Sequence, residues 1–229
     1  MRRRSFLTSF SALGLCGLCI RVLAEEADSA GCSLARGVAP ASDTTSRSGI
    51  VQLDRALIAE VKKVDRIFKI NPGYRFLRDG SRPNAYATPD TQVAGTSGTV
   101  LLGLTLMTNE LRTEYGGAAI AGIAAHEGGH IVQFNSPDTR QRLSGPTAKH
   151  AELHADFLAG YYFSRTGRTE KSLVTFAESL FSKGDYQFND RDHHGTPQER
   201  VASMRAGYSN GSLELIQAVE EGVNHVENT

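Results

Sequence analysis

The chain has 229 residues, of which 40% are hydrophobic and 22% are charged, and its formal net charge is zero. This length and composition are typical of one globular domain or at most two small ones. The lack of a basic surplus argues against a nucleic-acid partner, and the lack of an acidic surplus argues against a disordered chain.

Residues 1–24 have the pattern of an export signal. Arginines occupy positions 2–4, a short apolar stretch follows, and Val22-Leu23-Ala24 supplies the small residues of a cleavage site. The stretch is shorter than the roughly 20 apolar residues of a membrane span. Arg3-Arg4-Ser5-Phe6-Leu7 resembles a twin-arginine signal, with a general secretory signal as the alternative. We therefore predict a periplasmic or extracellular protein with no membrane span after signal removal.

Residues 25–48 are small, polar and unpatterned, which predicts a flexible leader. Cys32 is the one cysteine left after removal of the signal, so no internal disulfide is expected. A lipoprotein signal needs an aliphatic residue where Ser29 stands, so we do not expect lipid anchoring at Cys32. Residues 49–229 then form the predicted domain.

The domain begins with a predicted helix over residues 50–69, because Leu53, Leu57, Val61 and Val64 recur at helical spacing. Short strands are predicted at residues 74–77, 84–88 and 99–102. Further helices are predicted at residues 104–115, 118–134, 148–165, 169–181, 197–208 and 212–226, with polar loops at 138–146 and 184–196.

Several residues mark the ends of these helices. Gly116-Gly117 is expected to close the helix before it, Thr169 and Ser212 to cap the helices after them, and Pro197 to occupy a first turn. The chain is therefore predicted to be helix-rich with a small sheet, which is an α+β fold.

His126-Glu127-Gly128-Gly129-His130 carries the clearest chemistry. Residues four apart share a helix face, so His126 and His130 can bind one zinc ion. Glu127 can accept a proton from a metal-held water without taking a coordination position. Two packed, unliganded histidines are the alternative, but buried apolar surroundings make that costly. Gly128-Gly129 suggests close approach by another segment or by substrate, because each glycine costs about 1 kcal/mol in a helix.

A catalytic zinc site usually has three protein ligands. One class of zinc peptidase supplies a third histidine, but Gln133 and Ser136 occupy the positions that this class requires to be glycine and histidine. Glu152, on the next predicted helix, is the predicted third ligand, with His154 as the alternative. Asp156 shares a face with Glu152 and is placed to accept a hydrogen bond from a ligand histidine.

Four stretches of the chain resemble the gluzincin metallopeptidases, and within them the HtpX-like and CAAX-prenyl-protease group. The likeness covers about residues 50–208. Members of the HtpX kind are embedded in membranes, whereas this chain has no long apolar segment after residue 24. The four stretches are Asn84–Ala87, His126–His130, Glu152–Asp156 and His194–Val201.

The resemblance implies a zincin-like domain with two zinc-binding helices. It implies that His126, His130 and Glu152 bind one Zn²⁺ per chain and that Glu127 is the general base. His194 would stabilise the oxyanion, with His193 as the alternative, and Arg200 would help to hold that loop. Gly195 stands where the group has proline.

The resemblance also implies that a peptide or protein substrate binds as an added strand beside residues 84–88, and an ordinary strand of the sheet is the alternative. The leading hypothesis is therefore an exported zinc endopeptidase. The alternative is a non-catalytic, zinc-stabilised binding or chaperone-like module, against which the presence of Glu127 argues. The sequence predicts no oligomeric state.

Overall fold

The structure is a computed structural model, and it describes residues 31–32, 43–80, 83–113, 116–181 and 194–229. The predicted export signal at 1–24 and most of the predicted leader lie outside the described residues. Among the helices that are described, none is long and apolar enough to cross a lipid bilayer.

One mixed sheet contains the described strands, in the order β1-β4-β5-β3-β2. β3 runs parallel to β5, and β4 runs antiparallel to it on the other side. The three central strands confirm the three predicted from sequence. The strands are β1 Gly31–Cys32, β2 Thr44–Thr45, β3 Gly73–Leu77, β4 Asn84–Thr88 and β5 Thr99–Gly103.

The two outer strands come from the segment predicted to be a flexible leader. β1 pairs in parallel with β4 at Asn84 and Ala85, and β2 pairs with the end of β3. Backbone pairing with the sheet explains the difference, since the segment lacks an apolar pattern of its own. The edge of β4, predicted to be open to substrate, is therefore covered by β1 at its first two residues.

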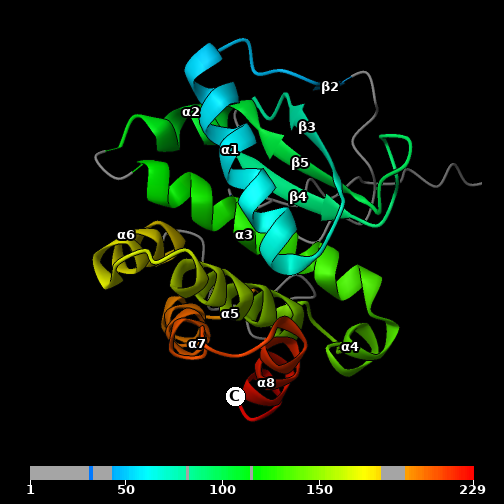
Figure 1. Cartoon of the computed structure of the whole chain (residues 1–229), viewed down its shortest axis with the longest axis vertical. Coiled ribbons are helices and arrows are strands. Elements are labelled where there is room, and N and C mark those ends of the chain that lie inside the picture. Colours follow the sequence, from blue (N-terminus) through cyan, green and yellow to red (C-terminus); the bar gives the residue numbers. More distant parts are fainter. Residues whose placement is uncertain (1–30, 33–42, 81–82, 114–115, 182–193) are drawn as a thin grey trace, which may run out of the picture.

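The helices confirm the helix-rich α+β prediction, and Figure 1 shows their order. Most of their ends lie within two residues of the predicted ones. The helices are α1 Val51–Phe68, α2 Leu104–Leu111, α3 Gly116–Asn135, α4 Pro137–Arg142, α5 Lys149–Arg165, α6 Glu170–Phe181, α7 Pro197–Ser209 and α8 Leu215–Glu227.

Two predicted helix boundaries and one predicted loop are wrong. Gly116 begins α3 and does not close α2, which already ends at Leu111. Pro137 follows the end of α3 and occupies the first turn of α4, a short helix where a loop was predicted, because proline's missing N–H is harmless there. Glu214, and not Ser212, is the N-cap of α8, in a reciprocal capping box with Gln217.

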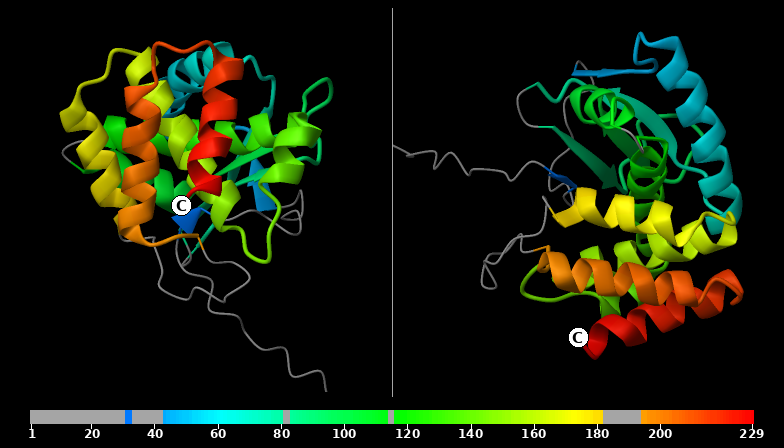
Figure 2. Two further views of the ribbon diagram at one scale, coloured as in Figure 1. Left: turned by 90° about the horizontal axis from the view of Figure 1, so that it is seen from below. Right: turned by 90° about the vertical axis from the view of Figure 1, so that its left-hand side faces the viewer.

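The molecule has a sheet half and a helical half, with α3 between them (Figure 1). α3 contacts β4 and β5 on one side and α5 on the other. α7 and α8 both contact α5, so α5 lies between α3 and these two helices. The right-hand view of Figure 2 shows the same separation, with α7 and α8 farthest from the sheet.

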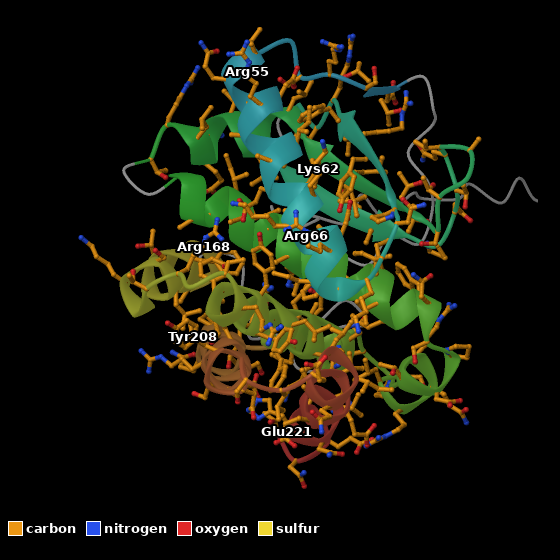
Figure 3. All side chains as sticks on the ribbon, in the orientation of Figure 1. Arg55, Lys62, Arg66, Arg168, Tyr208 and Glu221 are labelled. Carbon is orange, nitrogen blue, oxygen red and sulfur yellow. The ribbon has the colours of Figure 1, made fainter. Side chains whose placement is uncertain are left out.

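α1 is amphipathic and lies on the outside of the sheet half. Its buried face includes Leu53 and Val64, which are inaccessible to solvent. Arg55, Lys62 and Arg66 lie on its exposed face (Figure 3). The helical period that predicted α1 therefore also predicted which face it buries.

Two glycines inside the histidine motif allow neighbouring helices to approach α3 closely. A Cβ on Gly128 would lie 2.6 Å from Val64 Cγ1 of α1, and a Cβ on Gly129 would lie 3.2 Å from the Cα of Ala155 on α5. Of the two explanations offered from sequence, close approach by another segment is the one that the structure supports.

α5 and α7 also cross through a pair of glycines. A Cβ on Gly160 would collide with the backbone carbonyl of Met204, and a Cβ on Gly207 would collide with that of Phe157. The two helix backbones are therefore in direct contact. This contact places the buried side chains of α7 against α5.

Candidate metal centre

His126, His130 and Glu152 form one buried group in which three ligand atoms lie within 4.8 Å of one another. All three residues are fully inaccessible to solvent. The Nε2 atom of His126 lies 3.2 Å from Glu152 Oε2, and that of His130 lies 3.5 Å from Glu152 Oε1. α3 supplies both histidines and α5 supplies the carboxylate. This group can hold a metal ion.

The atoms that meet in this group are mainly hydrogen-bond acceptors. The two Nε2 atoms lie 3.2 Å apart, and each histidine turns its Nδ1 atom outward to a partner, Asp156 or Gln133. An imidazole with a proton on Nδ1 presents a lone pair at Nε2. Two such lone pairs and a carboxylate repel one another unless a cation lies between them. A divalent metal ion satisfies that requirement.

His126 is held by a charged support, which consists of Asp156 and Arg200. His126 Nδ1 lies 2.9 Å from Asp156 Oδ1. Arg200 donates to the same carboxylate from Nε at 2.7 Å and from Nη2 at 3.0 Å. Both members of the support are fully buried. A carboxylate behind a ligand histidine fixes the ring and raises its basicity.

His130 is held by a neutral support, which consists of Gln133, His154 and the carbonyl of Val219. His130 Nδ1 lies 3.0 Å from Gln133 Oε1. Gln133 Nε2 contacts His154 Nδ1 at 3.1 Å, and His154 Nε2 contacts the Val219 carbonyl at 3.1 Å. This support reaches from α3 across α5 to α8.

The two supports move the histidine pKa values in opposite directions. Burial alone lowers the pKa of His126, but the Asp156 and Glu152 carboxylates outweigh it and raise that pKa to about 10. Burial dominates at His130 and lowers its pKa to about 4. Without a metal, the proton that the group needs is therefore on His126. The raised pKa is a second sign that the group requires a positive charge.

Glu152 and Asp156 both remain ionised. Burial raises the pKa of Glu152, but the facing histidines His194 and His130 hold it well below its usual range. Burial acts in the same way on Asp156, and the Arg200 guanidinium and His126 lower its pKa. Arg200 balances one of the two carboxylates, so the other still needs a cation.

Glu127 and His194 also lie in this region. Glu127 follows His126 on α3 and is fully buried. His194 is 5% exposed, and its Nδ1 atom lies 3.4 Å from Glu152 Oε2. The structure therefore brings His194, from the segment before α7, against the predicted third ligand. His193 lies outside the described residues.

The sequence missed Gln133 and His154 as partners of the metal group. Gln133 was considered only as the residue that excludes a third histidine ligand, and His154 only as an alternative ligand. Both ring nitrogens of His154 are occupied by Gln133 and Val219, so His154 is not part of the group. The three-residue step from His130 to Gln133 was the available signal, since residues three apart are neighbours on a helix.

Arg200 donates hydrogen bonds to Asp156, a partner that the sequence did not predict for it. It was expected to help hold the loop around His194, and its described hydrogen bonds go to Asp156.

A comparison with known protein families, with curated proteins and with solved structures finds no match for this chain. The metal group and its supports are therefore the features from which the function is inferred.

Proposed function

We propose that the protein is a zinc-dependent endopeptidase of the gluzincin type, exported from the cytoplasm. The observation that carries this proposal is the buried group of two histidines and one glutamate, with a second glutamate beside it on α3. Three protein ligands and a general base are the parts of a catalytic zinc site. A site that only stabilises the fold does not need Glu127.

The two nitrogens and one carboxylate of the group suit zinc. When bound, zinc lowers the pKa of a coordinated water to about 7 and so supplies a nucleophile at neutral pH. Glu127 takes the proton from the attacking water and passes it to the leaving amine nitrogen. His194 donates a hydrogen bond to the oxygen on which negative charge develops, where such donors contribute most to rate.

Access to the site is a condition of this activity. The three metal ligands are inaccessible to solvent, and His194 is 5% exposed. A peptide can therefore reach the group only if a neighbouring segment moves. A zinc ion that only stabilises the fold needs no such access, because a structural site leaves no coordination position open to substrate. This observation favours the second candidate, a zinc-stabilised binding or chaperone-like module.

Replacement of Glu127 by glutamine separates the two candidates. We expect the E127Q protein to retain zinc, measured by elemental analysis, and to lose casein cleavage by roughly 100- to 10,000-fold, as expected for loss of a general base. Glu221→Gln is the matched control, because Glu221 is exposed on α8 (Figure 3) and outside the metal group.

Two outcomes contradict the peptidase. Cleavage that survives E127Q would rule out the proposed role of Glu127. Zinc in the wild-type protein with no cleavage of unfolded or peptide substrates would favour the binding module.

A further inference from the structure

The hydrogen bonds of the neutral support have directions that two backbone carbonyls determine. Gln133 Nε2 lies 2.8 Å from the carbonyl oxygen of Ala151. A carbonyl only accepts, so the Gln133 atom that faces it must be the amide nitrogen. Gln133 Oε1 then faces His130 and accepts from it, which places the His130 proton on Nδ1. The Nε2 lone pair of His130 is left for the metal group.

His154 extends the chain of directed hydrogen bonds from Gln133 to α8. The second N–H of the Gln133 amide points to His154 Nδ1, which therefore accepts. The remaining ring proton of His154 is on Nε2 and is donated to the carbonyl of Val219. One neutral tautomer, with its proton on Nε2, satisfies both contacts of the ring. Each donor in the support has one acceptor.

Burial makes this arrangement costly to lose. Gln133 is 2% exposed and His154 is fully buried. A buried polar group left without its partner costs about 1–3 kcal/mol. Rotation of the amide, or a change of the His154 tautomer, would leave such groups and is therefore disfavoured.

α8 has a glycine, Gly222, at the point where it packs against the His154 ring. A Cβ on Gly222 would lie 2.9 Å from His154 Cδ2 and 3.1 Å from His154 Nε2. Glycine in a helix costs about 1 kcal/mol relative to alanine. Gly222 lies one turn after Val219, so the absent side chain leaves room for the ring next to the carbonyl that accepts its proton.

We infer that Gln133 and His154 are positioning residues of the metal centre, and that the Val219 carbonyl of α8 sets the tautomer of His130 through them. The inference rests on the proposed zinc site. Val219 follows His154 by 65 residues, so a distant part of the chain controls the affinity of a ligand on α3. Loss of partners behind a ligand histidine costs about 10- to 100-fold in metal affinity.

The test measures zinc affinity of the full-length protein by competition with a chromophoric chelator. We expect Gln133→Met and His154→Leu each to weaken zinc binding by about 10- to 100-fold. His154→Asn retains an acceptor close to the position of Nδ1 and should recover most of that loss. Gly222→Ala should weaken binding less than His154→Leu, since it displaces the ring without removing its nitrogens.

His225→Asn is the matched control for damage to α8. His225 lies on the same helix and contacts Ser203 Oγ at 3.2 Å and the ring of Phe157. Neither of these described contacts is with a member of the neutral support. Its loss should lower the melting temperature of the zinc-free protein and leave zinc affinity unchanged.

Wild-type affinity in Gln133→Met and His154→Leu would overturn the inference. So would an equal loss of affinity in His225→Asn, because the effect would then be one of general stability. A protein that binds zinc through this support but cleaves no peptide would defeat the proposed function and leave the inference intact. A wild-type protein that binds no zinc would overturn both.

Discussion

His126 and His130 lie one turn apart on α3 and face the same carboxylate, but opposite kinds of partner hold them. The charged support fixes His126 through a buried carboxylate and guanidinium. The neutral support fixes His130 through an amide and a second imidazole. Two histidines in nearly the same place can therefore differ greatly in proton affinity. The difference originates in the partners behind the rings, which are Asp156 of α5 for His126 and Gln133 of α3 for His130.

The comparison also shows where the charge of the centre is balanced. Two charged supports would place a further carboxylate in a fully buried region, and each buried ion costs several kcal/mol unless it is paired. Two neutral supports would remove the carboxylate to which the buried Arg200 guanidinium donates. One support of each kind is consistent with a single divalent cation beside Glu152.

Removal of the guanidinium should have the largest effect on stability. Arg200→Met leaves Asp156 as a buried carboxylate without its cation, so we expect the free energy of unfolding to fall by about 3–5 kcal/mol. Urea unfolding measures this. Arg200→Met combined with Asp156→Asn should be more stable than Arg200→Met alone. If the double variant is no more stable, the two charges are not coupled.

Zinc binding should stabilise the protein only when both histidines are present. At zinc concentrations about 1,000 times the dissociation constant, the free energy of unfolding should rise by about 4 kcal/mol. Thermal melting with and without zinc measures this gain. His126→Ala and His130→Ala should each lose it, and His150→Ala, outside the metal group, should retain it. If zinc still stabilises one of these two variants, the histidine replaced in it is not a metal ligand.

Neutralising the charged support should weaken zinc binding. Asp156→Asn keeps an acceptor for His126 but removes the negative charge behind it. We expect zinc affinity to fall by about 10- to 100-fold, which corresponds to about 1.4–2.7 kcal/mol. Chelator competition provides the measurement, and Asp138→Asn, exposed on α4, is the control. Unchanged affinity would mean that the charge of Asp156 serves stability alone.

The helix caps should give the smallest effects. Thr196 caps α7, which carries Arg200, and Glu214 caps α8, which carries Val219. Thr196→Ala should cost about 1 kcal/mol of stability, and Glu214→Ala no more than that. Neither residue contacts the metal group, so zinc affinity should not change. A loss of affinity in one variant would show which support depends more on its helix end.

The fold could be predicted where one local signal was sufficient. Helical spacing predicted α1 and α5, and short β-rich runs predicted the three central strands. α4 was missed because Pro137 is a terminator for one helix and a good first-turn residue for the next. The outer strands were missed because their pairing is with β3 and β4, and no pattern in residues 31–45 encodes it.

The metal group could likewise be predicted only where the signal lay within a single helix. Spacing within one helix predicted His126 and His130, and the neighbouring helix offered Glu152 and Asp156. Their convergence is what the structure adds. The contacts of Gln133 with His154, and of Arg200 with Asp156, depend on how α3, α5, α7 and α8 pack. No spacing in the chain reports that packing.

The glycine crossing of α5 and α7 has a consequence for the order in which the protein folds. Arg200 reaches Asp156 only once Gly160 and Gly207 have brought the two backbones together. While α7 is detached, Arg200 does not hold the Asp156 carboxylate of α5, and the charged support of His126 is incomplete. Tight metal uptake should therefore be a late event during refolding, and its rate should follow the docking of the C-terminal helices.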